Sequence, residues 1–139
     1  MLPDKFSLKL TSPTVEGFLR LRKKVGWGEL DANLAEKSLT NSLFHVSICC
    51  EGQLIGMGRV VGDGAMYFYI QDVVVDPDYQ KLGIGTVLMD TIEGYLCYTA
   101  QKGATIGLLA AQGNESFYQR YAYIQRPSNA LGHGMCKFV

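Results

Sequence analysis

One stretch, residues 71–85, limits the folds open to the chain because it reads Gln-Asp-Val-Val-Val-Asp-Pro-Asp-Tyr-Gln-Lys-Leu-Gly-Ile-Gly. Its three successive valines are β-branched and favour a buried strand. Pro77 has no N–H to give to a ladder, so a central strand cannot continue through it. From Ile84 onward, apolar residues recur at the spacing of one helix face. The stretch therefore predicts a strand, a turn and a glycine loop that opens directly into a helix.

The start of that helix is suited to a negatively charged group. Gly83 and Gly85 have no Cβ, so a ligand can come close to the backbone there. The first amides of a helix have no partner within it, and the helix dipole is positive at that end. We therefore expect a phosphate-binding loop at the end of the central strand.

Spacing excludes two common glycine loops. The dinucleotide fingerprint needs a third glycine three residues after Gly85, and Leu88 stands there. A P-loop ends in Gly-Lys followed by Ser or Thr, and the chain contains no Gly-Lys pair. A third kind of phosphate loop must therefore be considered.

The remaining pattern, Gln80-x-x-Gly83-x-Gly85 after a valine strand and Asp-Pro, resembles the acyl-CoA loop of the GNAT N-acetyltransferases, whose signature is Arg/Gln-x-x-Gly-x-Gly/Ala. A second element of that family follows about thirty residues later. Leu-Leu-Ala-Ala at 108–111 and Phe-Tyr at 117–118 are similar to its strand and its Phe-Tyr-x-x-x-Gly-Phe helix, with Ala122-Tyr123 in place of Gly-Phe. The resemblance covers roughly residues 44–123.

The resemblance implies an α/β fold, with a GNAT-type mixed and mostly antiparallel central sheet flanked by helices. It implies a single acyl-CoA N-acyltransferase domain over residues 1–139. The implied reaction is N-acetyl transfer from acetyl-CoA to a primary amine, which we take to be a small molecule, directly within a ternary complex. The alternative is a non-catalytic acyl-CoA-binding or protein-interaction module of the same fold, since the exchange of Gly-Phe for Ala-Tyr leaves that open.

Local patterns place the elements along the chain. Strands are predicted at 5–10, 44–50, 53–61, 65–75, 104–111, 123–126 and 134–138. Helices are predicted from Ser12, as N-cap before Pro13, to about Lys24, and from an Asp31 cap to Asn41. Further helices are predicted at 83–101 and 114–120, and the strand–helix–strand unit around the first of them implies a parallel strand pair.

The resemblance implies a set of cofactor contacts. Main-chain groups of Val73 and Val75 would pair with the pantetheine arm of the cofactor. The backbone amides of six successive residues would hold its pyrophosphate: Lys81, Leu82, Gly83, Ile84, Gly85 and Thr86. Gln80 replaces the commoner arginine and keeps a hydrogen-bond donor without the charge. The Lys81 side chain is equally well explained as a solvated surface charge.

Acetyl transfer needs a proton donor for the leaving thiolate and a proton acceptor for the amine. Tyr118 is our candidate acid because it matches the tyrosine of the family's Phe-Tyr helix, with a packing role as the alternative and Tyr121 as a weaker candidate. Asp72 is our candidate base. Strand parity puts Asp72 on the face opposite Gln71 unless a bulge intervenes, so a structural role is the alternative.

The sequence says less about the pocket for the acceptor amine than about the cofactor site. We expect Trp27, Tyr69 and Gln71 to contact the substrate, and Tyr67 and Phe68 add to an aromatic stretch that is also typical of a core strand. Tyr69 and Gln71 could alternatively relay a proton through water. Arg59 fits either a carboxylate anchor or an ion pair with Asp72 or Asp63.

The amino-acid composition limits the classes of binding partner that we expect. Thirteen basic and thirteen acidic side chains balance, which favours neither nucleic acid nor an anionic membrane. The four cysteines have no metal-binding or disulfide pattern, so we expect reduced thiols, no metal and a cytoplasmic location. A Cys49 or Cys50 nucleophile with His45 or His133 is disfavoured, because extended chain separates His45 from Cys49 by about 13 Å. The oligomeric state is open, with a homodimer among the alternatives.

Overall fold

The computed structural model describes residues 2–139 and divides the chain after Gly107 into two compact units. Ten elements follow one another along the chain: β1 (Phe6–Lys9), α1 (Val15–Lys24), α2 (Ala32–Thr40), β2 (Phe44–Cys50), β3 (Gln53–Gly62), β4 (Tyr67–Val75), the 3-10 helix η1 (Pro77–Tyr79), α3 (Ile84–Thr99), β5 (Thr105–Leu108) and α4 (Glu115–Gln119). The single domain predicted over residues 1–139 stays a prediction.

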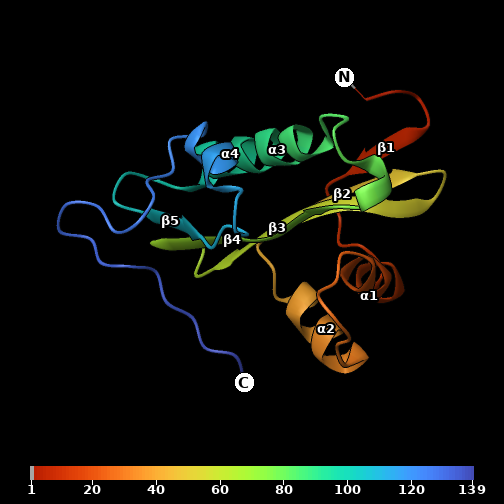
Figure 1. The fold of residues 1–139 in the computed structure, drawn as a ribbon, viewed down its shortest axis with the longest axis horizontal. Helices are drawn as coiled ribbons and strands as arrows, with labels where there is room; N and C mark the ends of the chain where they lie inside the picture. The colour runs from red at the N-terminus through yellow and green to blue at the C-terminus, as the bar shows by residue number, and fades with distance from the viewer. Residues whose placement is uncertain (1) are drawn as a thin grey trace. The chain divides into compact units, whose positions relative to one another are not determined.

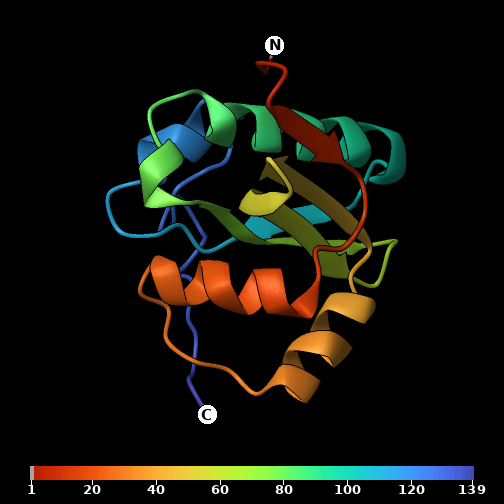
Figure 2. The same ribbon diagram turned by 90° about the vertical axis from the view of Figure 1, so that its right-hand side faces the viewer.

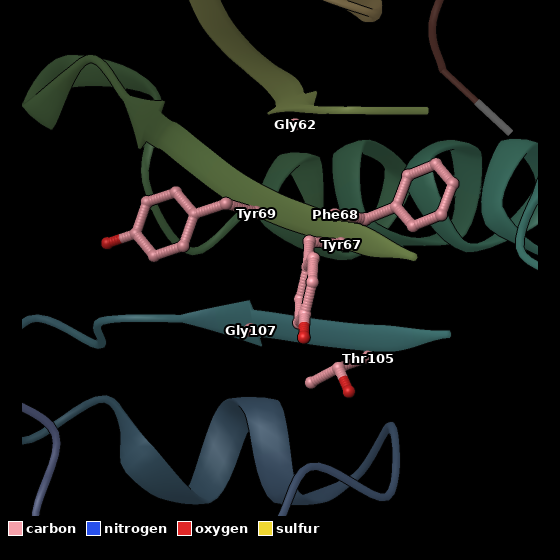
Figure 3. A pocket seen from close by; sticks show the side chains of 6 residues that line it. All are labelled: Gly62, Tyr67, Phe68, Tyr69, Thr105 and Gly107. Carbon is pink, nitrogen blue, oxygen red and sulfur yellow. The ribbon is translucent and has the colours of Figure 1, made fainter. Parts of the chain in front are cut away.

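The sheet is mixed and mostly antiparallel, as predicted. Its strands lie in the order β1-β2-β3-β4-β5, and each neighbouring pair from β1 to β4 is antiparallel. The labelled residues of β4 and β5 in Figure 3 run in the same direction, which is the parallel pair expected from a strand–helix–strand unit. Helix α3 covers one face of the sheet, and α1 and α2 lie on the other (Figures 1 and 2).

The starts of the first two helices follow from their caps. Thr14, not Ser12, caps α1, because its hydroxyl accepts the Gly17 amide at 3.0 Å. Pro13 therefore precedes the cap instead of forming the first helical turn. Asp31 caps α2 as predicted, accepting the Leu34 amide at 3.0 Å.

Two glycines of β3 let α3 pack close against the sheet. A Cβ at Gly58 would come within 2.8 Å of Cδ1 of Ile92, and one at Gly56 within 3.1 Å of Cγ2 of Ile84. Ile84 is the first residue of α3 and is buried. The start of the helix is therefore seated directly on β3, and any side chain at Gly56 would push it outward.

Several boundaries differ from the predicted ones. Strand β4 begins at Tyr67 and not at residue 65, because a carboxylate oxygen of Asp63 accepts the amides of residues 65, 66 and 67 in a tight turn. Strand β5 is shorter at both ends than the predicted 104–111. The strands predicted at 123–126 and 134–138 are wrong. Within the described residues that part of the chain holds only an isolated bridge between Ser128 and Leu131. Local alternation there supplies no partner ladder to satisfy the backbone.

Alanine substitutions at two glycines should change the stability of the protein in opposite directions. Gly94 lies in the middle of α3 with nothing within 4 Å of an added Cβ, so Gly94→Ala should raise the free energy of unfolding by about 0.5–1 kcal/mol. Gly62 has φ +147°, and an added Cβ would lie 2.1 Å from the backbone oxygen of Tyr67. Gly62→Ala should therefore cost more than about 2 kcal/mol. Urea unfolding of both variants measures this, and equal stabilities would contradict the packing described.

Candidate active site

The loop predicted to bind an anion leads into a helix start without a side-chain cap. Gly83 is the N-cap of α3, has φ +83°, and makes no capping hydrogen bond. A Cβ built at Gly83 would meet no atom within 4 Å, so the space beside it is open. A helix start whose N-cap residue provides no side-chain cap is the arrangement that accepts a phosphate.

The turn before this loop is tied to α1. The side chain of Asp76 is fully buried and accepts the Asp78 amide at 2.9 Å, while its own amide donates to the Ile55 carbonyl at 2.7 Å. Lys24, in the last turn of α1, donates to Asp78 at 2.7 Å and to Asp76 at 2.9 Å. These two hydrogen bonds, that to Asp78 first, raise the pKa of the Lys24 ammonium above its usual value. The chain therefore enters the loop from a fixed position.

Most side chains of the loop residues lie outside the core. Gln80 turns back, and its Nε2 donates to the Val75 carbonyl at 3.2 Å. Lys81 is exposed with φ +64°, a left-handed conformation that non-glycine residues adopt uncommonly, and Leu82 is also exposed. The side chains predicted for the cofactor site are therefore outside the core, apart from Ile84, whose side chain anchors the helix on β3.

Strand β4 contains a bulge at the predicted base. Gly58 of β3 stands opposite two residues of β4, Asp72 and Val73, because Met57 pairs with Val74 and Arg59 with Gln71. Asp72 takes φ +56° at this point. The bulge brings Asp72 and Gln71 together, with Nε2 of Gln71 donating to Oδ1 of Asp72 at 3.1 Å. The parity that would have put these two side chains on opposite faces is thus broken.

Asp72 is the centre of a buried ion pair. Its side chain is 2% exposed, and Oδ2 accepts Nε of Arg59 at 2.8 Å. Arg59 also donates to the Ser38 carbonyl, the Ser38 hydroxyl and the Ser42 hydroxyl at 2.9–3.1 Å, all beside α2. Asp72 and Asp63 were both considered as ion-pair partners of Arg59, and the structure shows the pair with Asp72. Because the carboxylate is buried and paired with Arg59, the geometry favours the structural alternative for Asp72 over the role of base.

A second arginine, not singled out in the sequence, approaches the same carboxylate. Nη1 of Arg22 lies 3.9 Å from Oδ1 of Asp72. The Arg22 guanidinium also lies over the ring of Trp27, 5.5 Å from its centroid, and 5.6 Å from that of Phe18. Two of the predicted substrate residues, Trp27 and Gln71, are therefore joined through Arg22 and Asp72. The signal for Arg22 is weak in the sequence, since a basic residue in a helix is commonly a surface charge.

The third predicted substrate residue, Tyr69, lines a pocket of about 200 Å³ between β4 and β5. The other lining residues are Gly62, Tyr67, Phe68, Thr105 and Gly107. In Figure 3 the Tyr67 ring reaches from β4 toward Gly107 and Thr105 of β5, whereas the Tyr69 ring points away along the strand. The aromatic stretch is thus divided: Phe68 is buried in the core, and the two tyrosines are at least partly exposed.

Tyr118 lies on α4, in the second unit, and is half-buried. Burial raises the pKa of its phenol above the usual 10.0, which keeps the hydroxyl protonated near neutral pH. Its ring packs edge-on against Phe117, with centroids 5.1 Å apart. Ala122, where the resembled family has glycine, has φ +69°, a conformation that glycine adopts without strain.

The other chemistries find little support. Nε2 of His45 is hydrogen-bonded to the Leu39 carbonyl at 2.9 Å, and burial lowers the pKa of the ring. Cys49 and Cys50 are free thiols. Across residues 2–139 no three histidine, cysteine or acidic side chains are grouped to hold a metal ion. No helix in that range is long and apolar enough to cross a membrane. The cytoplasmic location stays a prediction.

Comparisons with known proteins agree on one family. The family model described as an acetyltransferase (GNAT) domain matches residues 41–125. The chain is 29% identical over 117 residues to the uncharacterized N-acetyltransferase ycf52 of Pyropia yezoensis, covering 81% of this chain and 66% of that protein. It is 33% identical over 113 residues to a ycf52-like N-acetyltransferase of Prochlorococcus marinus, covering 78% of this chain and 61% of that protein. The chain thus spans less than two thirds of the length of these relatives.

Solved structures show the same likeness. A probable acetyltransferase from meticillin-resistant Staphylococcus aureus aligns with a TM-score of 0.86 at 29% identity, over 96% of this chain and 99% of that one. A GNAT family acetyltransferase from Streptococcus pneumoniae aligns with a TM-score of 0.74 at 26% identity, over 96% and 98% of the two chains. Both comparisons agree with the mixed, mostly antiparallel sheet and its flanking helices.

The buried ion pair predicts a large loss of stability when Asp72 is removed. Asp72→Ala leaves Arg59 buried without its counter-charge and should lower the free energy of unfolding by about 3–5 kcal/mol. Asp78→Ala removes an acid that is 73% exposed and serves as the control, with an expected loss of at most about 1 kcal/mol. Chemical denaturation measures both, and a loss below 1 kcal/mol for Asp72→Ala would contradict the structural role.

Proposed function

The chain belongs to the GNAT acetyltransferase family, and from that premise we propose that it transfers an acetyl group from acetyl-CoA to a primary amine of a small molecule, directly within a ternary complex. The observation that carries the proposal is the uncapped start of α3 at Gly83, which follows the bulged strand β4 after η1 and a short loop. The chain spans less than two thirds of the length of the curated relatives it matches, so the activity of the whole protein is part of this proposal.

The residues of the loop fit the proposed co-substrate. The open space beside Gly83 and the uncapped first turn suit a pyrophosphate, which the amides of residues 81–86 would hold. Main-chain groups of Val73 and Val75 would bind the pantetheine arm. The Val75 carbonyl already accepts Gln80 at 3.2 Å and has a second lone pair to offer. When bound, acetyl-CoA supplies an acetyl group activated as a thioester.

Tyr118 is the proposed general acid. As the bond from the carbonyl carbon to sulfur breaks and the bond to the amine nitrogen forms, the phenol donates its proton to the leaving sulfur. A thiol has a pKa of about 8.5. The phenol of Tyr118, with its pKa raised by burial, is protonated throughout the neutral range and can serve as that donor.

The amine has no dedicated base in this proposal. Asp72 is buried and paired with Arg59, so gaining a proton would weaken that pair. The acceptor therefore loses its proton to water, with Tyr69 and Gln71 as contacts on the acceptor side. Trp27 is 40% exposed and offers an aromatic surface to the apolar part of the acceptor.

Turnover with a panel of amines tests the function. Incubation of acetyl-CoA with amino acids, polyamines or arylalkylamines should release thiol, and without a base kcat/KM should rise about tenfold per pH unit below the amine pKa. Gly83→Asn keeps a residue that tolerates the left-handed conformation but fills the space beside the loop, so it should raise the acetyl-CoA Kd at least about tenfold. Mass spectrometry should find no acetyl group on any cysteine. Acetyl-CoA binding without turnover of any amine would instead support the non-catalytic binding module.

Removal of one hydroxyl group tests the acid. Tyr118→Phe should lower kcat by about 10²–10⁴-fold, because the thiolate leaves without a proton. The acetyl-CoA Kd should change no more than about threefold, since the phenol acts in the transition state. Tyr121→Phe, one helical turn away, is the matched control and should keep most of the activity. If Tyr118→Phe retains more than half of kcat while Tyr121→Phe does not, the acid is Tyr121.

A further inference from the structure

The cluster around Asp72 contains more positive than negative charge. Arg59 and Arg22 both approach this one carboxylate, at 2.8 Å and 3.9 Å. Asp72 is the acidic side chain that both arginines approach. The three side chains therefore carry a net charge of about +1 at neutral pH, in a place where Asp72 and Arg59 are nearly excluded from solvent.

The two arginines are not equivalent. Arg59 makes four hydrogen bonds, to Asp72, to the carbonyl and hydroxyl of Ser38 and to the hydroxyl of Ser42. Besides its contacts with the rings of Trp27 and Phe18, Arg22 has the long contact to Asp72, and its Nε is buried with no hydrogen-bond partner. A guanidinium has five N–H donors in a planar fork that matches a carboxylate. The uncompensated charge of the cluster therefore belongs to Arg22.

Arg22 also lies among the residues expected to contact the acceptor. Its guanidinium is over the ring of Trp27, and it shares Oδ1 of Asp72 with Gln71. Its side chain is 20% exposed, so it is held in place by packing and still accessible from solvent. Trp27 lies between two glycines with positive φ, at the start of the connection from α1 to α2.

We propose that Arg22 is a specificity-determining residue that binds a carboxylate of the acceptor, so that the preferred acceptors are amines that also carry a carboxylate. One carboxylate bound to the Arg22 guanidinium would neutralise the cluster. This inference deepens the proposed acetyl transfer and rests on it for the identity of the ligand as an acceptor.

Pairs of compounds that differ only by a carboxylate test the proposal. Leucine and 3-methylbutylamine, phenylalanine and 2-phenylethylamine, and lysine and cadaverine are three such pairs. For the pair that is turned over fastest, the member with the carboxylate should have a kcat/KM, calculated on the concentration of neutral amine, about 10- to 100-fold higher, the range expected for a charged hydrogen bond. Arg22→Gln should bring the two members within about threefold by raising KM for the carboxylate, with kcat nearly unchanged.

Two further variants separate charge from packing. Arg22→Lys keeps the charge and should recover part of the preference, and it replaces Arg22→Gln if that variant fails to fold. Lys23→Gln removes a charge from the next position of α1, where the side chain is 73% exposed, and should leave the preference intact. A wild-type protein that shows no preference for the carboxylate, or an Arg22→Gln variant that weakens acetyl-CoA binding instead, would overturn the assignment.

A binding measurement keeps this test independent of turnover. Trp27 is the only tryptophan in the chain, so its fluorescence reports on the Arg22 site alone. Titration with leucine should change that signal in the wild type, whereas 3-methylbutylamine should not, and Arg22→Gln should abolish the response. If no amine is acetylated but leucine still binds in this way, the proposed function fails and the carboxylate site stands. If amines are acetylated and neither the rate preference nor the fluorescence response is found, the carboxylate site fails and the function stands.

Discussion

The ion pair between Arg59 and Asp72 is the interaction on which the centre of the first unit depends. A buried charge is tolerated only when its partner and its hydrogen bonds are in place, because removal from water costs several kcal/mol for each ion. Here the bonds come from β4 and from the residues at the end of α2. The pair therefore fixes the position of α2 against the sheet as well as the conformation of Asp72 in the bulge.

The bulge determines what β4 presents on each face. On the face of α1 and α2 it brings Gln71 and Asp72 together, and Arg22 reaches them from α1. On the other face the glycines of β3 let the first residue of α3, Ile84, pack directly on the sheet. A single strand thus positions the candidate acceptor contacts in its middle and leads into the candidate anion seat at its end. The two features lie within about fifteen residues of sequence, which explains why that stretch dominates the sequence pattern.

Local signals predicted the parts of the fold that local physics controls. The valine strand, the glycine loop, the helix from Ile84 and the Asp31 cap each depend on residues close together in sequence. The bulge at Asp72 could only be raised as a condition, since it depends on the pairing with Gly58 across the sheet. Arg22 was not singled out because its contacts are with Trp27 and with a carboxylate fifty residues away, which no local pattern reveals. The strands predicted after Tyr121 failed for a related reason, because alternation alone does not provide a neighbouring strand.

The same ion pair limits the chemistry that Asp72 can perform. A general base needs a lone pair directed at the proton it removes, and it must gain that proton without losing other partners. Protonation of Asp72 would remove the charge that Arg59 requires in a buried site, so the gain of a proton would weaken the pair. If the acceptor is an amine with a pKa near 10.4, supplying its neutral form at pH 7 costs about 4 to 5 kcal/mol. Transfer of the proton to Asp72 would add the penalty for weakening the pair, whereas transfer to solvent leaves the pair intact. A carboxylate that supports the bulge is therefore poorly suited to be the catalytic base as well.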